Sequence, residues 1–151
     1  MKISFDLDGV IAEGHHWFFR LINCLATINH EESRQAELDY YSSRTLKYHP
    51  NLFLAEDDKG FIITARKSHS RNITYRWLER YGISLPIFFI DGVDEIDWSD
   101  YPKASELSGK RKADVIEQLG VDVHFDNNPT LVATLRKCLP GVKSILIGGE
   151  R

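Results

Sequence analysis

The chain has 151 residues, 42% of them hydrophobic and 27% charged, with a formal net charge of −3 at pH 7. These values are ordinary for one compact globular domain, and the slight negative charge gives no support for an extended nucleic-acid-binding surface. No apolar run reaches the length of a membrane span, and Asp6 and Asp8 interrupt the N-terminal stretch that a signal peptide would need. We therefore expect a cytoplasmic protein with no membrane partner.

Five short and mostly apolar segments along the chain are predicted to be strands. They are residues 2–6, 60–64, 87–90, 122–125 and 143–147. Several of these segments are almost continuous apolar runs, which is typical of strands that are covered on both faces of a sheet.

Helical patterns separate the later strands. Apolar residues recur at helical spacing in residues 70–81 and 110–119, and a glycine follows each segment, while residues 129–138 begin with a proline behind Asn128 as a candidate cap. This alternation predicts an α/β fold: a Rossmann-like three-layer sandwich whose central, mostly parallel sheet has about five strands.

Residues 13–58 interrupt this alternation directly after the first strand. One helix is expected over residues 15–28, a second over 31–38, and irregular aromatic structure over 40–54. We interpret the segment as a small helical cap inserted into a core formed by residues 1–12 and 59–151. An enlarged first crossover connection is the alternative, since any parallel crossover needs a helix.

The first predicted strand ends in FDLDGV, which contains two acidic residues one position apart. Because alternate side chains of a strand point the same way, Asp6 and Asp8 are expected to project together. Two adjacent carboxylates are costly unless a cation lies between them. The alternative is a polar turn with Asp8 and Gly9 at its corner.

More polar groups are expected at the same edge, because ligands bind at the carboxyl ends of the strands in open parallel sheets. The second strand is followed by Thr64, Ala65 and Arg66, and the fourth by the sequence DNN at residues 126–128. Lys110 and Lys112 open the preceding helical pattern, where a helix N-terminus itself favours an anion. Carboxylates, a hydroxyl and an ammonium together suit the joint binding of a divalent cation and a phosphate.

The segments FDLDGV, IITAR, KADVIEQLGV with its opening lysine, and HFDNNP resemble the four motifs of the haloacid dehalogenase (HAD) superfamily, in the same order. The resemblance covers the core and leaves out residues 13–58 and 91–107. It implies a HAD-type phosphatase in which Asp6 is the nucleophile, forming an aspartyl-phosphate, and Asp8 is the general acid and base. An acid at position 8 favours the phosphatase branch, because breaking a carbon–halogen bond needs no protonated leaving group.

The same resemblance implies a Mg²⁺ cofactor held by Asp6, Asp126 and the backbone carbonyl of Asp8. It also implies a phosphate site formed by the Thr64 hydroxyl, the Ala65 N–H and Lys112, with Lys110 and Lys103 as rival lysines. Many family members carry a further acid beside the first in the fourth motif. Here that place holds Asn127, which can orient a metal-bound water but brings no charge.

The expected substrate is a small phosphorylated metabolite, with nucleotides among the candidates. A phosphatase for nucleic-acid ends is the first alternative, although nucleic acid is the less favoured partner, and a non-catalytic phosphate-binding regulatory module is the second. Three further residues are candidates for contacting the substrate or supporting the site. They are His16 and Arg20 in the expected cap and Arg66 after the second strand.

Overall fold

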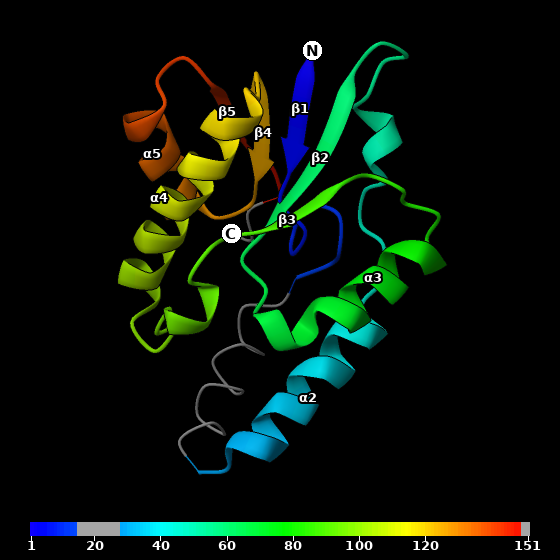
Figure 1. Cartoon of the computed structure of the whole chain (residues 1–151), viewed down its shortest axis with the longest axis vertical. Coiled ribbons are helices and arrows are strands. Elements are labelled where there is room, and N and C mark those ends of the chain that lie inside the picture. Colours follow the sequence, from blue (N-terminus) through cyan, green and yellow to red (C-terminus); the bar gives the residue numbers. More distant parts are fainter. Residues whose placement is uncertain (15–27, 149–151) are drawn as a thin grey trace.

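The computed structural model describes residues 1–14 and 28–148, and within them five strands form a single sheet (Figure 1). The strand order is β3-β2-β1-β4-β5, and every neighbouring pair is parallel. The strands are β1 (Lys2–Phe5), β2 (Lys59–Thr64), β3 (Ile87–Phe89), β4 (Val123–Asp126) and β5 (Lys143–Leu146). The predicted α/β class and the parallel five-stranded sheet are confirmed.

Helices cover both faces of the sheet, which explains why the strands read as continuous apolar runs. Helices α4 (Tyr101–Leu119) and α5 (Pro129–Cys138) lie on one side and α3 (Arg71–Arg80) on the other (Figure 1). Ile62 packs in the cluster with α3, whereas the next residue, Ile63, packs in the cluster with α4 and α5. This alternation is the pleat of a strand that is buried on both sides.

Helix α5 has the predicted bounds, and its predicted cap is confirmed. The Asn128 side-chain oxygen accepts a hydrogen bond from the Leu131 N–H at 3.1 Å. Its side-chain amide also donates to the Ser105 hydroxyl at 2.9 Å, so the cap is held from α4 as well. Short 3₁₀ turns are found at Pro50–Leu52, Ser68–Ser70 and Val93–Glu95.

Helix α4 begins nine residues earlier than the predicted start at residue 110. Asp100 caps it by accepting from the Lys103 N–H, and Pro102 stands in its first turn. The added turns are buried through small residues, namely Ala104, Ser105, Ser108 and Gly109, so they carry no apolar periodicity. Lys112 therefore lies in the middle of a long helix, and the predicted helix N-terminus beside it is wrong.

Helix α2 (His30–Ser43) lies beyond the carboxyl ends of the strands and beside α3 (Figure 1). It was predicted over 31–38 only, and Tyr40 and Tyr41, expected in irregular structure, belong to it. Its buried residues are Ser33, Glu37 and Tyr41, spaced four apart, so its inner face is largely polar and escapes a search for apolar periodicity. The expected helix at 15–28, with His16 and Arg20, falls outside the described residues except for Ile28.

The chain returns from α2 to the core by pairing with the loop that follows β1. Glu13 N–H donates to the Thr45 carbonyl at 3.0 Å, and Lys47 N–H donates to the Ile11 carbonyl at 2.7 Å. Residues 10–12 are buried in the core. This short ribbon places Arg44, which follows α2, next to the loop that carries Asp8. The proposed boundaries of a cap at 13–58 remain a prediction.

None of the described helices has the length and apolar character needed to cross a bilayer.

Gly109→Leu is expected to lower the free energy of unfolding by about 1–3 kcal/mol, because overpacking a filled helix interface is costly. A Cβ atom at Gly109 would lie 3.0 Å from the Thr134 Cβ on α5, whereas one at Gly141 would meet nothing within 4 Å. The exposed control Gly141→Leu should therefore change stability by less than about 0.5 kcal/mol in urea denaturation. Equal losses in the two variants would contradict the packing described for α4 and α5.

Candidate active site

The strand order brings the ends of three strands together, because β1 lies between β2 and β4. Asp6 continues the sheet beyond β1, since its N–H donates to the Phe125 carbonyl of β4 at 2.8 Å. Asp126 ends β4 and Thr64 ends β2. Asp6 and Asp126 therefore lie together at the carboxyl edge of the sheet, as predicted.

One buried lysine joins the two carboxylates. Lys112 Nζ donates to Asp6 Oδ1 at 2.6 Å and to Asp126 Oδ2 at 2.7 Å. The Lys112 side chain is 1% exposed, although it carries a charge. Of the two rival lysines, Lys110 is exposed and pairs with Glu106 at 2.7 Å, and Lys103 is exposed in the first turn of α4. Only Lys112 of these three contacts the predicted site.

The shared lysine leaves the pair of carboxylates short of positive charge. Burial raises the pKa of Asp6 to about 7, and repulsion from Asp126 and Asp8 adds to this rise, while Lys112 opposes it. Burial acts in the same direction on Asp126, but Lys112 and His124 together outweigh it and lower the pKa of Asp126. The single ammonium of Lys112 thus stabilises the negative charge of Asp126 more than that of Asp6.

Asp126 is further fixed by Asn128, predicted only as a helix cap, and by His124, which the sequence analysis gave no role. Its Oδ1 accepts from the Asn128 N–H at 2.9 Å, and the His124 ring Nε2 lies 3.4 Å from its Oδ2. His124 is fully buried, and its Nδ1 lies 2.8 Å from the Ser4 hydroxyl of β1. The signal in the sequence was the spacing of two between His124 and Asp126, which places both on one face of β4.

Asp8 belongs to a separate ion-pair system. Arg66 grips it with two hydrogen bonds, from Nε to Oδ2 at 2.8 Å and from Nη2 to Oδ1 at 2.7 Å. Arg66 also donates to Thr74 at 3.1 Å, and its guanidinium lies 3.9 Å from the centre of the Tyr41 ring. Arg44 Nη1 lies 3.9 Å from the same Oδ1 of Asp8. Arg66 was expected to contact substrate or support the site; the structure commits its guanidinium to Asp8.

These arginines set the charge of Asp8. Burial acts to raise the pKa of Asp8, but the Arg66 guanidinium outweighs it and holds that pKa below its usual value, with Arg44 adding to the effect. Asp8 is therefore ionised at neutral pH in this structure.

Thr64 and Ala65 lie level with the two aspartates on the neighbouring strand. Phe5 pairs in register with Ile62, so Thr64, two residues further along β2, stands beside the Asp6 to Asp8 stretch. Thr64 is 1% exposed, and its hydroxyl oxygen accepts from the Arg66 N–H at 3.2 Å. No acceptor within the described residues takes the hydroxyl hydrogen, so it can donate to a phosphate oxygen.

Asn127 packs directly against the glycine of the first motif. Gly9 has a φ of +90°, and a Cβ atom there would lie 2.0 Å from the Asn127 side-chain nitrogen. A side chain at position 9 would therefore meet both backbone strain and a collision. The glycine in FDLDGV lets the loop that carries Asp8 approach the end of β4.

The donors around Asp6 fit the predicted Mg²⁺ in chemistry. Among residues 1–14 and 28–148, no three side chains of His, Cys, Asp or Glu gather as a metal-binding cluster, in keeping with the Asp8 carboxylate being bound to Arg66. The predicted set needs only two carboxylates and a backbone carbonyl, because Mg²⁺ keeps several waters. Within the described residues the Asp6 carboxylate accepts a hydrogen bond from Lys112 alone, which leaves oxygen lone pairs that a cation could share.

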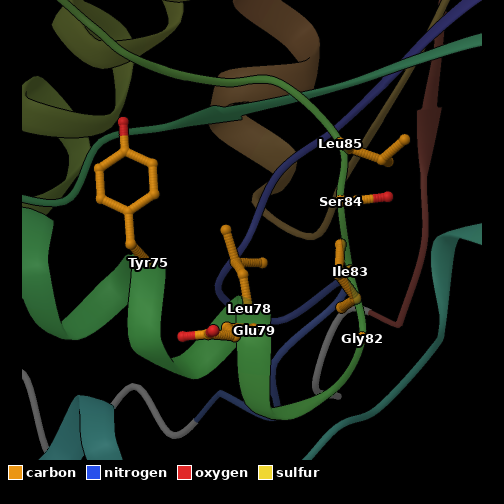
Figure 2. Close-up of a pocket in the computed structure, with 7 residues that line it drawn as sticks. All are labelled: Tyr75, Leu78, Glu79, Gly82, Ile83, Ser84 and Leu85. Atoms are coloured by element: carbon orange, nitrogen blue, oxygen red, sulfur yellow. The ribbon is translucent and has the colours of Figure 1, made fainter.

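A cavity of about 410 Å³ lies elsewhere, between α3 and the segment that leads into β3 (Figure 2). Its lining is mainly apolar and includes Leu78, Ile83 and Leu85, and it contains none of the predicted site residues that lie within 1–14 and 28–148. The predicted site at the sheet edge and this cavity are therefore separate features of the molecule.

Comparison with known proteins finds similarity in structure alone. No family model and no curated protein matches the chain. A chain in a structure of the Pnkp1/Rnl/Hen1 RNA repair complex matches with a TM-score of 0.63 and 17% identity, over 99% of this chain and 43% of that one. A chain in another structure of the Pnkp1/Rnl/Hen1 complex gives a TM-score of 0.64 and 14% identity, over 99% and 47%.

The likeness is one of fold. It agrees with the Rossmann-like architecture, and this chain spans less than half the length of each of those chains. At these identities, membership of the HAD superfamily remains a prediction based on the four motifs.

Arg66→Met is expected to lower the free energy of unfolding by about 2–3 kcal/mol, because it leaves the Asp8 carboxylate without its main partner in a largely buried position. The double variant Asp8→Asn/Arg66→Met should recover much of this loss, since the uncompensated charge is then gone. Arg71→Met, on an exposed arginine nearby, is the control and should cost less than about 1 kcal/mol. A strictly additive double-mutant cycle would show that the two residues are not coupled.

Proposed function

We propose that this protein is a magnesium-dependent phosphohydrolase that removes phosphate from phosphomonoesters through an aspartyl-phosphate on Asp6. The observation that carries the proposal is the contact of Lys112 Nζ with both Asp6 and Asp126, at 2.6 and 2.7 Å, at the carboxyl edge of the sheet. In this buried group Asp6 is the proposed nucleophile, Lys112 is the ammonium that would bind a phosphate, and Asp126 is a second carboxylate for the cation.

The contacts of Asp6 suit nucleophilic attack. Lys112 holds Oδ1, which fixes the plane of the carboxylate and leaves Oδ2 free to attack phosphorus. The bond from Oδ2 to phosphorus forms as the bond from phosphorus to the leaving oxygen breaks, and Thr64, Ala65 and Lys112 bind the phosphoryl oxygens. Mg²⁺ at Asp6, Asp126 and the Asp8 carbonyl would offset the repulsion between carboxylate and phosphate.

Asp8 supplies the two proton transfers. The leaving oxygen takes a proton from Asp8 in the first half of the reaction, and a water gives a proton to Asp8 while it attacks the aspartyl-phosphate in the second. The ionised carboxylate held by Arg66 is ready for the second role. The first role requires protonation, and a phosphate dianion brought beside Asp8 promotes it by opposing the arginines.

Two substrate classes follow from the observations. A small phosphorylated metabolite agrees with the slight negative charge of the chain, which gives no support for a large nucleic-acid-binding surface. A phosphorylated nucleic-acid end is supported by the likeness to chains of an RNA repair complex. Arg71 also supports this class, because it is an exposed cation close to the site. Its guanidinium lies 4.7 Å from the centre of the Phe89 ring, and Phe89 pairs in register with Thr64. The second class predicts rates that fall steeply with salt.

Asp6→Asn should abolish hydrolysis of an aryl phosphate, with a loss of at least about 10³-fold in kcat, because no covalent intermediate can form. The fold should persist, since the amide is isosteric and Lys112 keeps its bond to Asp126. Asp91→Asn is the matched control, because Asp91 is exposed in the chain's other DGV sequence. Near wild-type turnover by Asp6→Asn would remove Asp6 from the nucleophile role.

Removal of divalent metal with a chelator should abolish turnover, and added Mg²⁺ should restore it. Independently of activity, Mg²⁺ at 100 times its dissociation constant should stabilise the wild-type fold by about 2.7 kcal/mol. Asp126→Asn should lose most of this stabilisation, because it removes one of the two carboxylate ligands. Unchanged rates in excess chelator would exclude Mg²⁺ from the reaction.

A further inference from the structure

Arg44 is held rigidly beside the proposed site, at the end of α2. Its carbonyl oxygen accepts from the Trp77 indole N–H at 2.8 Å and from the Tyr81 hydroxyl at 3.3 Å. Both donors come from α3 or its C-terminal cap, and Trp77 is fully buried. Thr45, the next residue, pairs with Glu13 after the loop of Asp8. The backbone of Arg44 is therefore fixed to the core from two directions.

The side chain of Arg44 is buried with one nitrogen unused. Arg44 is 4% exposed, its guanidinium lies 4.5 Å from the centre of the Tyr40 ring, and Nη1 donates to the Tyr40 hydroxyl. Nη2 is buried and has no hydrogen-bond partner among the residues that the structure describes. A buried donor left without a partner costs about 1–3 kcal/mol, so its retention calls for an explanation.

The position of this nitrogen is beside the loop of the first motif. A Cβ atom at Gly14 would lie 3.4 Å from Arg44 Nη2 and 3.2 Å from the backbone nitrogen of Gly9. Nη1 of the same guanidinium is 3.9 Å from Asp8 Oδ1. Nη2 thus lies beside Gly14 and the Gly9 backbone in the loop of the first motif, while Nη1 faces Asp8.

The charges around Asp8 favour an anion. Two guanidinium groups, Arg66 and Arg44, face a single carboxylate, and Arg66 already satisfies both of its oxygens. Glu37, the acid beside Tyr41, is bound to the Tyr41 hydroxyl at 3.1 Å and to His69 at 2.8 Å. Arg44 therefore carries positive charge that no described group neutralises at hydrogen-bond distance, the reverse of the situation around Asp6.

We infer that Arg44 binds a second anionic group of the substrate, carried by the leaving group. The inference rests on the proposed function, in which Asp8 contacts the leaving oxygen; whatever lies beyond Asp8 then belongs to the leaving group. A phosphate, a phosphodiester or a carboxylate offers the charged acceptor that Nη2 lacks. Arg44 is on this basis a specificity-determining residue that separates substrates with one anionic group from substrates with two.

The test compares two substrates that differ only in the second anion: propane-1,3-diol monophosphate and the corresponding bisphosphate. Wild-type protein should prefer the bisphosphate in kcat/KM. Arg44→Gln should lose at least about 10-fold in kcat/KM on the bisphosphate, mainly through KM, and less than about 3-fold on the monophosphate. Equal losses on both substrates would mean that Arg44 acts only through Asp8 and would overturn the inference.

Two companion variants keep the result interpretable. Arg44→Lys retains the charge but lacks the planar guanidinium. Its kcat/KM on the bisphosphate should therefore lie between those of wild type and Arg44→Gln, and its melting temperature should match that of wild type. Arg111→Gln is the matched control, because Arg111 also has a buried nitrogen without a partner, yet it donates to the Asp91 carbonyl and not toward Asp8. A selective loss in Arg111→Gln equal to that in Arg44→Gln would overturn the assignment.

The two proposals fail separately. Absence of turnover of the monophosphate and of aryl phosphates by wild-type protein would defeat the proposed function alone. Calorimetric binding of the bisphosphate to Asp6→Asn, with and without Arg44→Gln, tests the second anion site without turnover; an unchanged dissociation constant overturns the inference. Oligonucleotides with one terminal phosphate identify the source of the second anion. If Arg44→Gln lowers kcat/KM on these oligonucleotides, the anion is a phosphodiester. If it lowers kcat/KM on the bisphosphate alone, the anion is a second phosphate.

Discussion

The bridge from Lys112 to Asp6 and Asp126 is the contact on which the site depends. A buried ammonium and two buried carboxylates are each unfavourable alone, and only their joint placement makes any of them tolerable. The bridge also spans the fold, because it joins the middle of α4 to the ends of β1 and β4. Since a parallel sheet brings those strand ends together, the sheet order and the charge arrangement support each other.

The polar groups at the sheet edge divide into two systems with opposite imbalances. Around Asp6 there is more negative than positive charge, which favours a bound cation; around Asp8 the guanidinium groups of Arg44 and Arg66 are in excess, which favours a bound anion. Under the proposed function, a cation at Asp6 and the anionic phosphate ester beside Asp8 would meet the two needs together. Asp6 and Asp8 are two residues apart in sequence, yet their partners come from opposite sides of the sheet, α4 for one and the β2–α3 segment with Arg44 for the other.

Much of this arrangement was predictable from sequence because it follows from short-range rules. Apolar runs defined the strands, Asn128 and Pro129 defined the start of α5, and the topology of a parallel sheet grouped Asp6, Thr64 and Asp126. The start of α4 was missed because its first turns bury Ala104, Ser105 and Ser108, which produce no apolar period. The partners of Asp8 were missed because an ion pair between residues 8 and 66 leaves no trace in local spacing. Arg44 was one of several aromatic and basic residues of the expected cap, with nothing in the sequence to set it apart.

The ribbon between residues 11–13 and 45–47 has a consequence for how such a protein changes over time. The chain leaves the core and rejoins it at almost the same point, so the intervening segment is a loop whose two ends are already held together. Altering the length of such a loop costs little, about 0.6 kcal/mol for each doubling. The length of this excursion can therefore change while Asp6, Lys112 and Asp126 stay in place, and Arg44, at the exit of the loop, stays fixed to the core by its contacts with Trp77 and Tyr81.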